Sequence, residues 1–201
     1  MTDMMDDQKA RASDWFRSLR DEIVARFEAL EDSHAAGPFA DHDAGRFDVT
    51  PTTRATEDGS DAGGGLMSVM RGGRVFEKVG VNISTVYGTL GRAAQKAMAA
   101  RGVPGIEEDP RFWASGISLV AHMCNPHVPA VHMNTRMFWT PGAWWFGGGS
   151  DLNPCIEYDE DTAHFHAVQQ QHLDPHGTHL YPELKAWADE YFYIPHRKRA
   201  R

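Results

Sequence analysis

The chain has 201 residues, of which 41% are hydrophobic and 24% charged, a balance that excludes disordered, fibrous and membrane-embedded classes and fits one domain. Its formal net charge of −8 disfavours general binding to nucleic acid, so an anionic ligand has to meet a local basic pocket. No window approaches about 18 apolar residues and the N-terminus lacks a signal-peptide core, so we expect a cytoplasmic location without membrane insertion.

The N-terminal part predicts one helix and a long loop. Residues 8–31 repeat large apolar side chains at helical spacing with charges between them, which is typical of an amphipathic helix. Residues 32–65 are rich in Gly, Asp, Thr and Pro and lack periodicity, so we expect a loop there. The sequence therefore predicts a helix and loop over residues 1–62, followed by a domain over residues 63–201.

The rest of the chain predicts neighbouring short strands and separate helices. Strands are expected at 66–69, 75–78, 81–85, 112–120, 130–139 and 144–146. Helices are expected at 89–101, 160–173 and 182–192. This order predicts an α+β fold with a mainly antiparallel sheet flanked by helices on both faces.

The segment VHMNTRMF carries the clearest chemical pattern. Because side chains alternate along a strand, His132, Asn134 and Arg136 are expected on one face, with Thr135 and the apolar side chains opposite. A proton donor, an amide and a guanidinium together could bind a carboxylate and move a proton. The alternative is an ordinary solvated face, although such faces more often carry Thr, Lys and Glu.

Two flanking segments supply further polar side chains. Alternation places Ser118 and His122 on one face of the preceding strand, so two polar faces meet if the strands pair. Ser118 is not expected to be a nucleophile, because no Gly-x-Ser-x-Gly elbow is present. In WWFGGGSDL, Asp151 follows three glycines that allow close approach of a ligand to the backbone; the alternative is a tight turn capped by Asp151.

Histidine is concentrated in the C-terminal part, where nine of the eleven follow residue 121. Such a cluster suits proton transfer or metal binding, whereas any single member is more typical of a solvated surface. His164 and His166 would point about 200° apart on a helix, and no HExxH motif is present. Cys124 and Cys155 are too few for a zinc ribbon, so spacing alone selects no metal ligands.

Six strings in the same order resemble the oxygen-dependent coproporphyrinogen-III oxidases: GGGLMSV, VFEKVGVNIS, SLVAHMCNPHVPAVHMNTRMF, WWFGGGSDLNP, EDTAHFH and YPELKAWADEYFYIPHR. The resemblance implies oxidative decarboxylation of two propionates of coproporphyrinogen III to vinyl groups, a step of heme biosynthesis that gives protoporphyrinogen IX. It implies O2 as the oxidant, CO2 and hydrogen peroxide as further products, and no organic cofactor.

The same resemblance implies roles for single residues. His132 corresponds to a proton donor, Asp151 to a contact of the pyrrole N–H groups, and Arg136 to a further catalytic residue. The implied substrate-binding residues are Ser118, Asn134, Thr135 and Arg136. For bacterial members it implies a divalent metal ion held by four histidines, here His122, His132, His166 and His196.

Family members continue for about a hundred residues past the point that matches Arg201. The resemblance therefore predicts that residues 63–201 are the N-terminal two-thirds of one oxidase domain, which forms a homodimer when complete. Two other functions stay open from the residues alone: a non-catalytic tetrapyrrole or metal binder, and a metal-dependent hydrolase built on the histidines. Anaerobic incubation separates them, because only the oxidase must stop without O2.

Overall fold

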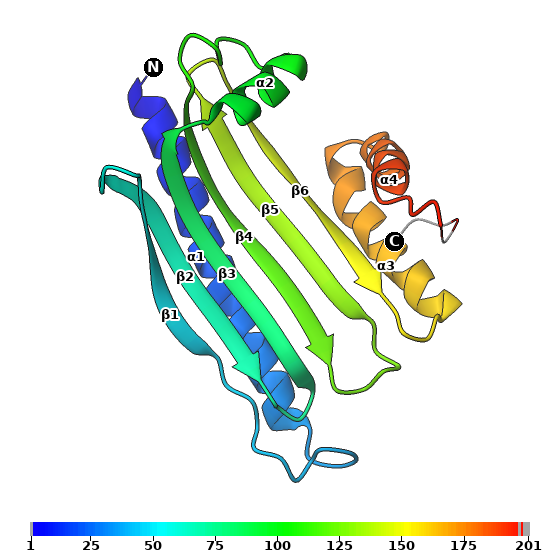
Figure 1. The fold of residues 1–201 in the computed structure, drawn as a ribbon. Coiled ribbons are helices and arrows are strands. Elements are labelled where there is room, and N and C mark those ends of the chain that lie inside the picture. The colour runs from blue at the N-terminus through cyan, green and yellow to red at the C-terminus, as the bar shows by residue number, and fades with distance from the viewer. Residues whose placement is uncertain (1, 197, 199–201) are drawn as a thin grey trace. The chain divides into compact units, whose positions relative to one another are not determined.

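The computed structural model describes residues 2–196 and 198, and its helices and strands are shown in Figure 1. The helices are α1 (Thr2–Ser33), α2 (Arg92–Ala100), α3 (Asp159–Leu173), the short 3₁₀ helix η1 (Asp174–His176) and α4 (Leu180–Tyr191). The strands are β1 (Asp48–Ala55), β2 (Asp61–Arg71), β3 (Phe76–Thr89), β4 (Arg111–Met123), β5 (Ala130–Thr140) and β6 (Ala143–Asn153). Contacts divide the chain into two compact units, residues 1–124 with 131–150, and residues 125–130 with 151–201.

The strands form one sheet in the order β1-β2-β3-β4-β5-β6, so neighbours in the chain are neighbours in the sheet. The pairs from β1 to β5 are all antiparallel. This confirms the predicted α+β fold with a mainly antiparallel sheet. The four predicted helices are also confirmed, with ends that move by a few residues at each terminus.

Helix α1 packs along one face of the sheet (Figure 1) and buries most of the apolar stripe that the sequence predicts, whereas Trp15 and Leu30 of that stripe are exposed. Phe16 is 1% exposed, and burial of a side chain of this size contributes about 2 to 3 kcal/mol. The alternating side chains of β3, β4 and β5 complete this core, which includes Val79, Val81, Ile83, Ile117, Leu119, Ala121 and Met137. The intervening side chains of the same strands therefore lie on the opposite face.

A buried carboxylate joins the end of α1 to the hairpin between β2 and β3. Glu31 is 0% exposed, and each of its carboxylate oxygens accepts two backbone N–H groups. The donors are Gly45 at 2.9 Å, Arg74 at 2.6 Å, and Val75 and Phe76 at 2.9 Å each. Such charge-assisted bonds are stronger than neutral ones, so Glu31 fixes the hairpin against the helix.

Burial by itself would raise the pKa of the Glu31 carboxyl, but the hydrogen bonds from these four amides oppose it. Their combined effect is larger, and the pKa lies below the ordinary value of 4.5. Glu31 is therefore ionised in the folded protein at neutral pH.

The expected loop over residues 32–65 is wrong in part. Residues 48–55 form β1, and β2 already begins at Asp61, so the predicted boundary between residues 62 and 63 falls inside a strand. Strand β1 is an edge strand that is exposed at every position and contains Pro51. It has no buried side to produce an alternating pattern, so the sequence carries no strand signal there.

The alternative of a tight turn at the three glycines, capped by Asp151, is wrong, and the strand expected at 144–146 is longer than predicted. Strand β6 runs through all three glycines and Asp151 to Asn153. Gly148 lies so close to β5 that an added Cβ would be 2.3 Å from the Asn134 carbonyl oxygen. The glycine run therefore allows close strand pairing rather than a reversal of the chain.

In the second unit, α3 and α4 contact each other through His166 and Tyr181, whose ring centres are 6.3 Å apart. Burial lowers the pKa of His166 and nearby Lys185 lowers it further, while Asp189 opposes the shift. His164, by contrast, is exposed, as the two-residue separation on a helix predicts. Among the described residues, no helix is both long and apolar enough to cross a membrane.

Candidate functional site

The face of the sheet opposite α1 carries the predicted polar residues of the first unit, and we call it the site face. The register places Asn134 beside Ser118, His132 beside Val120, and Arg136 beside Gly116. These residues project away from the core, because their neighbours in sequence are the buried ones. The prediction that His132, Asn134 and Arg136 share one strand face is therefore confirmed.

Arg136 is the exposed cation that follows Asn134 on the site face, at the end away from Lys78. Its neighbour across the strand pair is Gly116, which has no side chain to cover it. An added Cβ at Gly116 would come within 2.7 Å of the Arg136 Cβ, so the glycine keeps this position open. Among residues 2–196 and 198, Arg136 has no carboxylate within ion-pair distance. A guanidinium left unpaired in an acidic protein is suited to bind the carboxylate of a ligand.

Asn82 belongs to the same row of side chains and is missing from the sequence-based site. The register aligns it with Ser118, which in turn is aligned with Asn134, so three polar side chains cross β3, β4 and β5 in line. The Ser68 backbone N–H donates to Asn82 Oδ1 at 3.1 Å, which fixes the amide plane. The Asn82 amide nitrogen then lies over Gly80 and, among the residues that the structure describes, has no acceptor, so it can donate to a ligand.

The signal for Asn82 was present in VGVNIS. Val79, Val81 and Ile83 alternate with small and polar residues, which predicts Asn82 on a polar strand face. That pattern reveals the face but not its neighbours, because the register of β3 against β4 is set by distant residues.

His122 and His132 occupy the end of the site face away from Arg136. The register places His122 beside Lys78 of β3, and both are exposed. His132 is half-buried. The site face therefore carries imidazoles at one end and a guanidinium at the other, with the row of Asn82, Ser118 and Asn134 between them.

Three stacked aromatic rings continue the site face beyond Arg136. Phe138 stacks on Phe112 with ring centres 5.8 Å apart and on Trp145 at 4.9 Å. The three rings come from β4, β5 and β6 and form a contiguous apolar row. A ligand with a flat apolar body and acidic side chains matches this combination of surfaces.

Thr135 is the one predicted substrate-binding residue that the sheet directs elsewhere. It is aligned with Ile117, which is 2% exposed in the core on the α1 side. The side chain of Thr135 thus lies on the opposite face from Asn134 and Arg136, as strand alternation requires. Thr135 is therefore not part of the site face.

Asp151 lies in the part of β6 that belongs to the second unit. It is 6% exposed, and Asn153 donates a hydrogen bond from Nδ2 to its Oδ1 at 2.5 Å. A carboxylate that is buried inside a strand and held by a neighbouring amide has a fixed orientation. This geometry suits a preorganised charge better than a solvated turn cap.

The four-histidine metal site stays a prediction. His122 and His132 belong to the first unit, and His166 and His196 to the second. Within the described part of the chain, no three His, Cys, Asp or Glu side chains form a group that could hold a metal ion.

Comparison with known proteins gives one consistent result. The family model described as coproporphyrinogen III oxidase matches residues 11–201. The oxygen-dependent coproporphyrinogen-III oxidase of Rickettsia bellii (strain RML369-C) is 44% identical over 189 residues, which are 94% of this chain and 63% of the relative. The protein of the same name from Rickettsia peacockii (strain Rustic) is 40% identical over 195 residues, 97% of this chain and 65% of the relative. The chain thus spans slightly less than two-thirds of the length of these curated relatives.

Proposed function

Because the chain belongs to the coproporphyrinogen III oxidase family, we propose that the protein oxidatively decarboxylates two propionate side chains of coproporphyrinogen III, with O2 as the oxidant. For each propionic acid, the Cα–carboxyl bond breaks and the Cβ loses hydrogen, so that a vinyl group and CO2 form. The two electrons and two protons reduce O2 to hydrogen peroxide. The product is protoporphyrinogen IX, which places the reaction in heme biosynthesis.

The single observation that carries this proposal is the unpaired guanidinium of Arg136 beside a row of hydrogen-bonding side chains on the site face. A substrate with four carboxylates needs such a cation in a protein of net charge −8. We assign Arg136 to a propionate carboxylate. Asn82, Ser118 and Asn134 are then placed to donate hydrogen bonds along the same substrate edge.

His132 is the proton-transfer group of the proposal. Imidazole is the commonest general acid and base in proteins, so this side chain can donate or accept a proton at each step. Asp151 is the proposed acceptor for the pyrrole N–H groups. Its negative charge would stabilise the positive charge that develops as the electron-rich ring is oxidised.

Replacing Arg136 with lysine in the active enzyme should lower kcat/KM for coproporphyrinogen III by about tenfold. Lysine keeps the charge but loses the planar fork that binds both carboxylate oxygens. The matched control is Arg111→Lys, because Arg111 is already paired with Asp109 at 2.5 Å near the start of β4. An unchanged kcat/KM in the Arg136 variant would remove this residue from the substrate site.

Removal of O2 tests the function itself. Protein incubated with coproporphyrinogen III under air should release CO2 and hydrogen peroxide in equal amounts, and both should stop under anaerobic conditions. Hydrolysis that continues without O2 would favour a metal-dependent hydrolase. Tight binding of the tetrapyrrole without turnover in air would favour a non-catalytic binder.

The proposal includes O2 as the co-substrate and no organic cofactor. A divalent ion at His122, His132, His166 and His196 is kept as a separate hypothesis that metal analysis of the purified protein addresses. The expected cytoplasmic location and the homodimer are also part of the proposal, and cell fractionation and light scattering measure them.

A further inference from the structure

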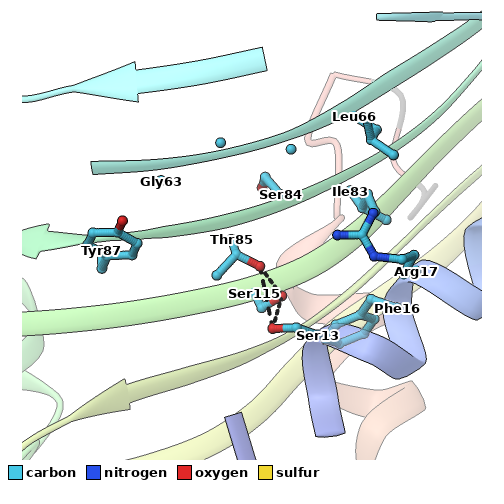
Figure 2. A pocket seen from close by; sticks show the side chains of 12 residues that line it. Ser13, Phe16, Arg17, Gly63, Leu66, Ile83, Ser84, Thr85, Tyr87 and Ser115 are labelled. Atoms are coloured by element: carbon cyan, nitrogen blue, oxygen red, sulfur yellow. Dashed lines mark hydrogen bonds between the residues drawn. The ribbon is translucent and has the colours of Figure 1, made fainter. Parts of the chain in front are cut away.

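A pocket of about 310 Å³ lies between α1 and the strands β2, β3 and β4, on the α1 side of the sheet. Its lining combines one cation, five hydroxyl-bearing residues, three glycines and three apolar side chains (Figure 2). The aligned site residues Ser118, Asn134 and Arg136 project from the other face of the sheet. The pocket is therefore a separate feature that the proposed oxidase reaction does not use.

Arg17 supplies the charge of the pocket. Figure 2 shows its guanidinium extending from α1 toward Ile83 of β3, and both residues line the pocket. Among the described residues, no carboxylate lies within ion-pair distance of Arg17. Lys9, two turns earlier in α1, is already engaged, because its ammonium lies 3.5 Å from the Trp139 ring centre and 3.7 Å from Asp6. Arg17 is thus the cation that remains for a ligand.

Three hydroxyl groups form a connected chain on the pocket wall. Ser13 donates to Ser115 at 3.3 Å, and Ser115 shares a hydrogen bond with Thr85 at 2.8 Å (Figure 2). The distance between the hydroxyl oxygens of Ser13 and Thr85 is 3.5 Å, which is at the limit of a hydrogen bond. The short bond between Ser115 and Thr85 and the longer one from Ser13 use two of the three hydroxyl hydrogens. One O–H is left to donate to an acceptor in the pocket.

The pocket wall toward β2 is backbone. Gly63, Gly64 and Gly65 line it without side chains, and Cβ atoms there would lie within 2.1 Å of carbonyl oxygens of the neighbouring strands. Phe16 and Leu66 add apolar surface. Tyr87 is held by a hydrogen bond to Asp61, which also accepts the Gly63 amide at 2.9 Å, so this carboxylate is satisfied by its own neighbours.

We propose that this pocket binds a carboxylate carried on a short apolar stem, with Arg17 pairing with the carboxylate and the hydroxyl chain donating to one of its oxygens. A free cation and a free O–H donor fit an anionic acceptor, and the apolar wall fits the stem. The volume is at the low end for small-molecule sites, which suits a short acid better than a whole tetrapyrrole. The ligand is either a small free carboxylate or one propionate arm of a larger molecule.

Titration of the labelled protein with sodium butyrate, followed by backbone amide NMR, tests the proposal. Butyrate should shift the amides of Gly63–Gly65 and Thr85 saturably, while neutral butyramide should not. Arg17→Gln should weaken butyrate binding about tenfold or more, because a charge-assisted pair is lost. Thr85→Val keeps the shape of the side chain and should weaken binding several-fold.

The matched control is Arg11→Gln, since Arg11 is also an exposed arginine of α1 without an ion pair among the described residues but does not line the pocket. Its butyrate affinity should equal that of the unmodified protein. Displacement of butyrate by coproporphyrin III would assign the ligand as a propionate arm, and its absence would assign a free carboxylate. Equal affinity of the Arg17→Gln and unmodified proteins, or shifts confined to Asn134 and Arg136, would overturn the proposal.

Discussion

Replacing Glu31 with glutamine is expected to lower the free energy of unfolding by about 3 to 5 kcal/mol. Each carboxylate oxygen accepts two backbone N–H groups, and the amide nitrogen of glutamine cannot accept any. Two buried donors would lose their acceptor and face another donor. Urea unfolding followed by circular dichroism measures the difference.

Glu28 provides the matched control for this variant. It lies in the same helix and accepts only one backbone amide, that of Phe47 at 2.9 Å, which the oxygen of a glutamine can still accept. Glu28→Gln should therefore cost less than about 1 kcal/mol. If the two variants lose the same free energy of unfolding, the four hydrogen bonds of Glu31 contribute no more to stability than the single bond of Glu28.

The same carboxylate predicts an acid-sensitive stability. The pKa of Glu31 is lower in the folded state than its ordinary value of 4.5, so its contribution is complete above that value. The contribution should disappear as the pH falls from 4.5 toward and through the lower folded-state pKa. The Glu31→Gln protein should lack this part of the pH dependence, which distinguishes lost charge from lost packing.

Replacing Asp151 with asparagine should reduce kcat of the active enzyme by about a hundredfold, or on the order of 3 kcal/mol of transition-state stabilisation. The shape is conserved and only the negative charge is lost. The apparent affinity for coproporphyrinogen III should change less, because the charge matters most as the ring is oxidised. Steady-state kinetics of the folded variant measure both quantities.

Asn153→Ala separates charge from orientation. It removes the donor that bonds Asp151 at 2.5 Å and leaves the carboxylate ionisable, so the expected loss in kcat is only several-fold. If a stably folded Asp151→Asn protein turns over at the normal rate, Asp151 has a structural role alone.

The sequence predicts those helices and strands whose own apolar periodicity shows which side is buried. In α1 the apolar stripe around Phe16 is local information, and so is the alternation around Asn134 in β5. Strand β1 gives no such signal because it is exposed throughout. Glu31 looks like an ordinary helix-surface charge, since the amides that bury it come from residues 14 to 45 positions later in the chain.

The candidate site shows the same division. Strand alternation predicts which side chains of β5 share a face, but only the register brings Asn82 into line with Ser118 and Asn134. The resemblance to known oxidases names Asp151 from its motif. Its burial and its bond to Asn153 depend on β6 continuing through the glycines, where a turn was the local expectation.

The alternation in β5 also limits how this protein can vary in evolution. Met133 and Met137 pack against the core from the same strand that presents Asn134 and Arg136 on the site face. Deletion of one residue from the middle of β5 would exchange the two sets, sending a guanidinium into the core and a methionine to the ligand. Relatives should therefore conserve the length of the strand, and insertions should collect in the connections at its ends.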